Sequence, residues 1–187
     1  ATSFNQDLNS WRPSKVTDLS SMFKGATAFN GNIGAWTVGK VTTFESFAEG
    51  ASAFNSDVGA WNIGNATTLA KMFKNATAFN QDLRAWDMGG VTTASEMFTG
   101  AALSTANYNK MLYSWAYGQA TDGVENGAGT GVITDSVVFS AGAAKYSVGQ
   151  PTDARKVLTD RGWSITDGGQ TSQNVPNPPT GVSQSRT

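Results

Sequence analysis

Hydrophobic and polar positions recur along the first hundred residues with a fixed period of 25 residues. Two aromatic ladders show the period: Phe4, Phe29, Phe54 and Phe79, and Trp11, Trp36, Trp61 and Trp86. Because a unit of this length cannot bury its own apolar face, four consecutive copies without insertion predict units that stack on one another. Equivalent side chains then lie in ladders, and we expect Trp36 and Trp61 to be buried.

Each unit contains two predicted elements. The segment Asp7–Trp11 has one aliphatic residue between polar neighbours, which indicates a short strand that pairs in parallel with its copies. The segment Val16–Gly25 carries apolar residues at helical spacing and predicts a helix of about two turns. We expect a left-handed residue at the end of each helix, where the repeats place Gly25, Gly50, Asn75 and Gly100.

The repeat reads FNxDL, a tryptophan three residues on, a valine-threonine pair, then MF and a glycine or asparagine. In these motifs the chain resembles the BspA-like leucine-rich-repeat surface proteins of bacteria. Period and resemblance together predict an α/β fold: a right-handed leucine-rich-repeat-like solenoid of strand-plus-short-helix coils with a mixed α/β C-terminal cap. The resemblance implies an extracellular, surface-attached recognition or adhesion module.

Three regions follow from the pattern. Residues 1–101 hold the four repeats, residues 102–169 form a capping region, and residues 170–187 are a Pro/Ser/Asn-rich linker or disordered tail. Within the cap we expect a helix at Tyr108–Tyr117, a loop at 119–134, a strand at Val137–Phe139, a helix at Pro151–Arg161 and a strand at Trp163–Thr166. We interpret the chain as a monomeric fragment of a larger multidomain protein.

The amino-acid composition argues against several classes of function. The 13 basic and 14 acidic residues are spread evenly, so no basic stripe indicates nucleic-acid binding. No apolar run approaches 18 residues, so we expect no direct insertion into a membrane. The chain has no cysteine and no histidine, and thus lacks the usual thiol nucleophile, general base and transition-metal ligand. We expect no enzyme and no cofactor, with calcium as the one exception to be considered.

The outward positions of the predicted strands are the candidate ligand-binding residues. If Leu8 points inward, its neighbours point outward and stack in two columns: Asp7, Asn32, Asp57 and Asp82, and beside them Asn9, Gly34, Gly59 and Arg84. The candidate contacts are Asp7, Asn9, Asn32, Asp57, Asp82 and Arg84, with Asp57 and Asp82 as candidate calcium ligands. The alternative is that these carboxylates lie on a solvated strand edge or accept a hydrogen bond from a neighbouring turn. The glycines predict a shallow groove.

Three other ladders have both a structural and a binding interpretation. The asparagines at Asn5, Asn30, Asn55 and Asn80 could contact a sugar, or could bond one another and the turn backbone. The tryptophans could stack on sugar rings, but their inward position favours the core. The pairs Thr42-Thr43, Thr67-Thr68 and Thr92-Thr93 are typical of ice-binding repeats, or cap the predicted helices.

The sequence therefore favours a non-catalytic extracellular binding or adhesion module of a cell-surface protein that recognises a protein, a peptide or a glycan. A passive structural spacer in a surface adhesin and an ice-binding repeat protein are the alternatives.

Overall fold

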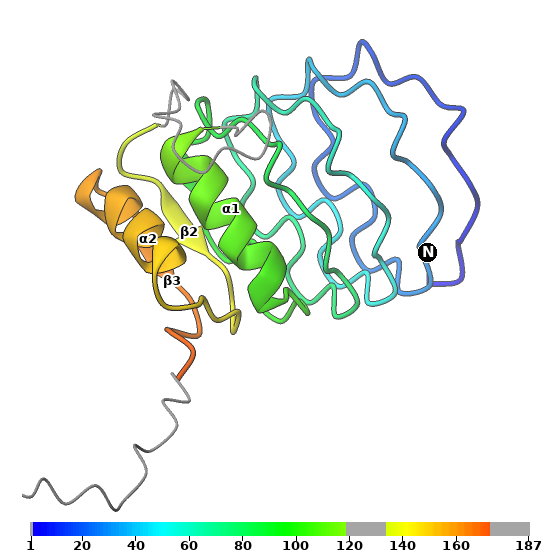
Figure 1. Cartoon of the computed structure of the whole chain (residues 1–187). Helices are drawn as coiled ribbons and strands as arrows, with labels where there is room; N and C mark the ends of the chain where they lie inside the picture. The colour runs from blue at the N-terminus through cyan, green and yellow to red at the C-terminus, as the bar shows by residue number, and fades with distance from the viewer. Residues whose placement is uncertain (1, 119–133, 173–187) are drawn as a thin grey trace, which may run out of the picture.

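The computed structural model describes residues 2–118 and 134–172, and this part of the chain contains two helices and three strands. In chain order they are β1 (Thr93–Ala94), α1 (Thr105–Tyr117), β2 (Val138–Ser140), α2 (Gln150–Asp160) and β3 (Ser164–Thr166). The strands form one parallel sheet in the order β1-β2-β3 (Figure 1), with Thr93 opposite Val138 and Val138 opposite Ser164.

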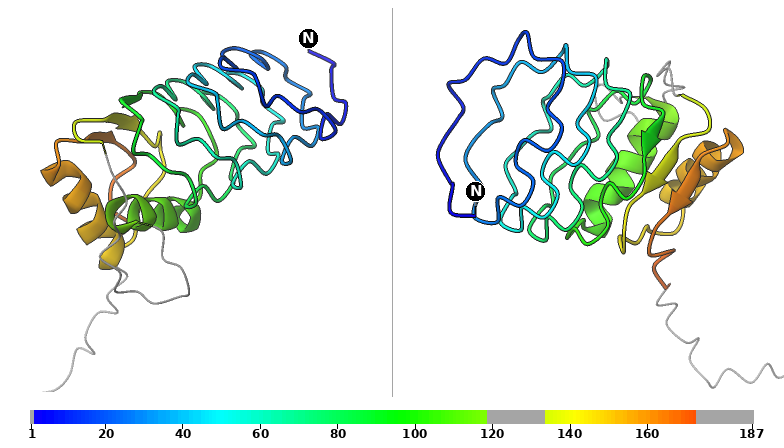
Figure 2. Two further views of the ribbon diagram at one scale, coloured as in Figure 1. Left: turned by 90° about the horizontal axis from the view of Figure 1, so that it is seen from above. Right: turned by 180° about the vertical axis from the view of Figure 1, so that it is seen from behind.

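The repeats form a stack of turn-rich coils, one for each 25 residues, with the helices and the sheet at the far end of the stack (Figures 1 and 2). Backbone bonds join each coil to the next. In the first coil the donors are the N–H groups of Leu19, Ser21, Phe23 and Gly25, and the acceptors are the carbonyls of Thr43, Glu45, Phe47 and Glu49. The intervening N–H groups bond within their own coil: those of Met22 and Lys24 to the carbonyl three residues earlier, and that of Ser20 to the side chain of Asp18.

The predicted fold class, a leucine-rich-repeat-like solenoid of strand-plus-short-helix coils, is wrong. Both described helices lie outside the repeats, in residues 105–160, and the sheet is a small three-stranded one. A helix at Val16–Gly25 would need each N–H to bond a carbonyl four residues earlier, whereas alternate N–H groups here leave the segment for the next coil. Ser21 also has φ 57° in the middle of that segment, which no right-handed helix allows.

The predicted strand at Asp7–Trp11 is also replaced by a turn. The Trp11 N–H donates to the Leu8 carbonyl at 2.9 Å, so the chain bends where an extended strand was expected. The repeats instead pair through single parallel bridges, Asp18 with Thr43, Thr43 with Thr68 and Thr68 with Thr93. These bridges continue into β1 and the sheet, and they lie in the segment for which the apolar spacing predicted a helix.

The core consists of the ladders that the period predicts. Trp36 and Trp61 are 4% and 3% exposed, which confirms that they are buried. Their rings lie parallel at 6.1 Å between centroids, and each indole N–H donates to a backbone carbonyl of the preceding coil, at Leu8 and Ile33 respectively. Each tryptophan thus contributes apolar burial and a hydrogen bond between coils.

The left-handed turn at the end of each repeat segment is confirmed. Gly25, Gly50 and Gly100 have φ values of 68°, 72° and 76°, and Asn75 has φ 58°. Glycine adopts this conformation without steric cost and asparagine tolerates it better than most residues. The turn is present even though the helix that it was expected to end is not.

The C-terminal elements agree with the sequence interpretation within a few residues. Helix α1 covers the predicted Tyr108–Tyr117, and α2 covers nearly all of Pro151–Arg161. The buried Tyr108 of α1 joins them, because its hydroxyl donates to Asp167, which also accepts from Arg155 of α2 at 2.8 Å. Neither described helix has the length and apolar character needed to cross a bilayer. Most of the predicted loop at 119–134 and of the tail at 170–187 lies outside the described residues.

Candidate binding surfaces

The first predicted column consists of turn-forming side chains. In each coil the side chain accepts a hydrogen bond from the backbone N–H two residues later, at 2.7 to 3.2 Å: Asp7 from Asn9, Asn32 from Gly34, Asp57 from Gly59 and Asp82 from Arg84. This is the Asx turn, in which a short carboxylate or amide replaces a backbone acceptor. One oxygen of each side chain is therefore used for folding, as the structural alternative expected.

The second column brings the coils close together. The Asn9 side chain accepts from the Ala35 N–H of the next coil at 2.7 Å. A Cβ added at Gly59 would lie 2.5 Å from the carbonyl oxygen of Asp82, and one added at Gly34 would lie 2.9 Å from that of Asp57. The space that predicted a shallow groove is thus occupied by the backbone of the following coil.

Asp82 differs from the other members of its column because two cations of the chain lie beside it. Lys110 Nζ is 2.9 Å and Arg84 Nη2 is 3.1 Å from Asp82 Oδ2. Among residues 2–118 and 134–172, no group of three or more acidic, histidine or cysteine side chains is placed to hold a metal ion. Asp57 and Asp82 therefore have no third such ligand in the described structure that would complete a calcium site.

The asparagine ladder acts between coils. The Asn5 side-chain oxygen accepts from the Asn30 N–H at 2.8 Å, and the same bond recurs from Asn55 to Asn30 and from Asn80 to Asn55. These amides satisfy backbone donors that no regular strand pairs, which is the structural role considered for them.

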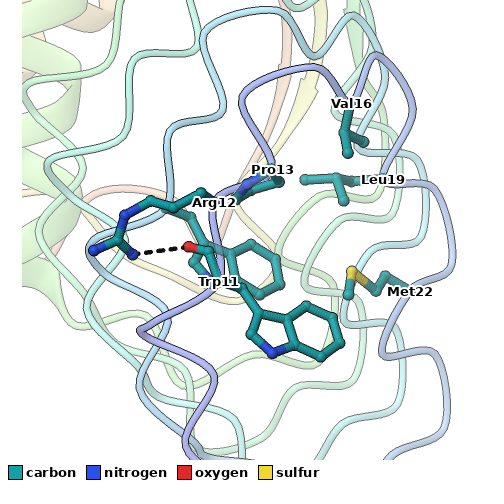
Figure 3. Close-up of a pocket in the computed structure, with 7 residues that line it drawn as sticks. Trp11, Arg12, Pro13, Val16, Leu19 and Met22 are labelled. Atoms are coloured by element: carbon teal, nitrogen blue, oxygen red, sulfur yellow. Dashed lines mark hydrogen bonds between the residues drawn. The ribbon is translucent and has the colours of Figure 1, made fainter.

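One apolar opening is at a surface that the sequence interpretation did not single out. It is the end of the stack formed by the first coil, where Trp11 is 52% and Met22 37% exposed, although the equivalent residues of the third coil are buried. A pocket of about 250 Å³ lies there (Figure 3), lined by Trp11, Arg12, Pro13, Val16, Leu19, Met22 and Trp36. We call this surface the end face.

A row of backbone acceptors borders the end face. The carbonyls equivalent to those that accept from the preceding coil elsewhere in the stack belong to Asp18, Ser20, Met22 and Lys24, and within the described residues they accept no hydrogen bond. The Trp11 indole N–H also has no partner there, whereas its three copies all donate to carbonyls. Hydrogen bonds from the hydroxyl and N–H of Ser20 lower the pKa of Asp18, which keeps a negative charge beside the row.

The end face could have been found from the sequence by one signal. Trp11, Val16 and Met22 are the first members of their ladders in this sequence, so they were the residues to examine.

Comparison with known proteins gives a family and no close relative. No curated protein and no solved structure matches the chain significantly. A family model described as "Mycoplasma protein of unknown function, DUF285" matches residues 1–122, which include all four coils and α1. Since the match covers well over half of the chain, this protein belongs to the DUF285 family.

Proposed function

We propose that the chain is a non-catalytic interaction module of a larger cell-surface protein, and that it binds a polypeptide at its end face. The observation that carries the proposal is the exposed apolar pocket around Trp11 and Met22 beside a row of free backbone carbonyls. Apolar anchors next to unpaired backbone groups are what strand-addition sites offer to an extended peptide. A glycan would stack on the indole, but only its hydroxyl groups could donate hydrogen bonds to the row of backbone carbonyls.

The extracellular placement has separate support. The FNxDL and MF motifs resemble those of BspA-like surface proteins, whose expected role is recognition or adhesion. We call the two predicted columns of outward residues, which begin at Asp7 and Asn9, the side columns. They are weaker candidates for binding a polypeptide, because Asp7, Asn32 and Asp57 each use a side-chain oxygen to close a turn. Asp82 is further neutralised by Lys110 and Arg84.

A peptide array with the whole chain tests the proposal. We expect peptides to be captured by the wild type and lost in Trp11→Ala, because the indole forms one wall of the pocket. The matched control is Val138→Ala, which removes another exposed apolar side chain, 49% exposed, from the opposite end of the stack. Capture that survives Trp11→Ala would contradict the proposal, and Asp57→Ala/Asp82→Ala would then test the side columns.

Ice binding is a second candidate, favoured by the exposed threonine column at Thr17, Thr42, Thr67 and Thr92. The hydroxyls of Thr42, Thr67 and Thr92 donate to the threonine carbonyl of the preceding coil at 3.0 to 3.1 Å, which fixes the orientation of each side chain. A regular array of fixed methyl groups is the surface that this function needs. Thermal hysteresis in the wild type that is absent in Thr67→Lys would support ice binding. If the wild type and the variant show the same freezing behaviour, ice binding is rejected.

A further inference from the structure

We propose that Asn75 is the acceptor of an N-linked glycan when the chain passes through a secretory route. The residue lies at the exposed turn that ends the third coil, and Ala76 and Thr77 follow it. Asparagine two residues before serine or threonine, with no proline between them, is the acceptor pattern of N-glycosylation. The inference rests on the extracellular placement in the proposed function and adds a covalent modification to it.

The acceptor arises from one change in the repeat. The other three coils have glycine at this position, Gly25, Gly50 and Gly100, each with positive φ. Asn75 adopts the same conformation, with φ 58°, although a side chain is less well tolerated there than none. Left-handed asparagine commonly forms a local hydrogen bond with its side chain, but within residues 2–118 and 134–172 this amide has no hydrogen-bond partner. The hydrogen bonds of the described fold therefore do not explain why asparagine replaces glycine.

The surroundings of Asn75 suit a bulky attachment. A Cβ added at Gly100 would clash with Asn75 Oδ1, so the amide lies over a residue of the next coil that has no side chain. Asn75, Thr77 and Ala78 are all exposed, and Ala76 between them is buried. The turn thus presents the amide at the surface while its own backbone stays anchored, since the Asn75 N–H donates to the Thr99 carbonyl at 2.8 Å.

The Thr77 hydroxyl has a role in the repeat as well. It donates to the Ser52 carbonyl at 3.2 Å, and the Ser52 hydroxyl donates to the Thr27 carbonyl at 3.2 Å in the same way. A hydroxyl at this position is therefore explained by the contact between coils. What distinguishes the third coil is the asparagine alone.

A second copy of the acceptor pattern gives an internal comparison. It is Asn65-Ala66-Thr67, in which the asparagine is also exposed and in a turn, and the threonine hydroxyl also donates to a carbonyl of the preceding coil, at 3.1 Å. The difference is that Asn65 Nδ2 donates to the Gly39 carbonyl at 2.6 Å. A glycan on that nitrogen would crowd a contact between two coils. The folded stack therefore favours Asn75 as the acceptor.

The transfer exchanges one bond for another. Asn75 Nδ2 forms a bond to the anomeric carbon of an activated sugar, and the bond from that carbon to the phosphate or diphosphate of the glycosyl donor breaks. One amide proton passes to a base of the transferring enzyme and the other stays on the nitrogen. Because Nδ2 bonds nothing in the described stack, the product keeps the hydrogen bonds between coils.

The test moves the acceptor from one coil to another. The whole chain is secreted from insect cells behind a cleavable signal sequence as wild type, as Asn75→Gly and as the double variant Gly50→Asn/Asn75→Gly. The first variant restores the residue of the other coils. In the double variant Ala51 and Ser52 complete the acceptor pattern, and a Cβ at residue 50 would lie 3.9 Å from Gly25, which is ordinary van der Waals contact. The new side chain again lies over a glycine of the next coil.

We expect a glycan on Asn75 in the wild type, its loss in Asn75→Gly and a glycan on residue 50 in the double variant. An amidase that leaves aspartate in place of glycosylated asparagine, followed by peptide mass spectrometry, measures each site on secreted and retained chains alike. Occupancy at Asn65 should be lower than at Asn75. The glycosylated wild type should melt no lower than the same chain made in bacterial cytosol.

Three results would overturn the inference. The first is an unmodified Asn75, or an unmodified residue 50 in the double variant. The second is an occupancy at Asn65 equal to or above that at Asn75. The third is a lower Tm for the glycosylated chain, because the folded stack would then not accommodate the sugar.

Peptide capture separates this inference from the proposed function. Capture that depends on Trp11 should be the same in the wild type and in Asn75→Gly, because Asn75 does not line the pocket. If Asn75 carries a glycan and no peptide is captured, the proposed binding is wrong and the inference stands. If peptides are captured while Asn75 stays unmodified, only the inference is wrong.

Discussion

At the scale of single residues, each buried tryptophan of the stack holds two coils together in two ways. Trp61 stacks on Trp36 and its indole N–H donates to Ile33 at 3.2 Å, while only 3% of its surface is exposed. Large apolar burial and a satisfied polar atom in one side chain explain why tryptophan recurs at this position in all four coils.

We predict that Trp61→Ala lowers the free energy of unfolding by about 3–5 kcal/mol, as large-to-small core changes do. Trp61→Phe keeps most of the ring contact and loses the hydrogen bond, so it should cost less. Urea unfolding followed by circular dichroism measures both. Trp11→Ala is the matched control on the same ladder, since that indole is half exposed. A loss at Trp61 no larger than at Trp11 would contradict the role of the buried ladder.

The residue scale is also where the sequence was most informative. Inward positions such as Trp36 and left-handed positions such as Gly25 and Asn75 were predicted, because burial and positive φ restrict the residue type strongly. Ser21, Lys71 and Glu96 also have positive φ, and nothing in their residue types indicates it. Their conformation is set by hydrogen bonds between coils and is invisible in one repeat.

At the scale of elements, the segment Val16–Gly25 shows why apolar spacing was not sufficient. Apolar residues three or four apart face one side of a helix, and they face one side equally well in a series of turns whose N–H groups bond three residues back. Helix formation competes with the row of carbonyls on the next coil, which accept hydrogen bonds from every second N–H group of the segment. Helices α1 and α2 were predictable because no such neighbour competes along their length.

Ion pairs add a pH-dependent link between coils. Lys24 of the first coil lies 2.9 Å from Glu49 of the second, and the contact with Lys24 lowers the pKa of Glu49 below its ordinary value of 4.5. A lowered pKa in the folded state means that the stabilisation is fully present above pH 4.5 and is lost as the pH falls through the folded-state pKa.

We therefore predict that Glu49→Gln makes the free energy of unfolding less dependent on pH in the range below 4.5 than it is in the wild type. Urea unfolding at a series of pH values from 7 downwards measures this. Glu45→Gln, an exposed carboxylate on the same coil, serves as the control and should leave the pH dependence of the wild type in place. An unchanged profile in Glu49→Gln would show that the pair does not stabilise the stack.

The contact between α1 and α2 gives a prediction of its own. Tyr108 donates to Asp167 at 2.7 Å, and burial raises the pKa of Tyr108, which keeps its hydroxyl a proton donor. Tyr108→Phe leaves a carboxylate that is 4% exposed with one donor fewer, and should cost about 1.5–3 kcal/mol. Tyr117→Phe on the same helix should change stability by less than about 0.5 kcal/mol. Equal effects in denaturant unfolding would show that the Tyr108–Asp167 bond is not stabilising.

At the scale of the whole molecule, the two candidate binding surfaces differ in how much of each could be predicted from the sequence. The side columns were identified as exposed positions, but their Asx turns depend on a bend at Asn9 and Ser10 that was interpreted as a strand. The end face depends on which direction the hydrogen bonds of Leu19 and its neighbours take through the stack. Direction along a stack is a property of several coils together, so one repeat does not reveal it.

Because each coil contacts only the coils next to it in the stack, we predict that a whole coil can be removed. Deleting residues 51–75 joins Gly50 to Ala76 and places Trp36 against Trp86, Phe29 against Phe79 and Asn30 against Asn80, which preserves the aromatic and asparagine contacts between coils but removes the ion pairs of Lys71 and Lys74 with Glu96. We expect a folded, cooperative protein with a lower Tm, because one set of contacts between coils is lost. Deleting residues 51–62 removes half as much chain but breaks the register, so it should abolish cooperative unfolding. Thermal denaturation and the dispersion of the ¹H-¹⁵N spectrum compare the two. If the 25-residue deletion is the more disruptive, stability does not arise from contacts between adjacent coils.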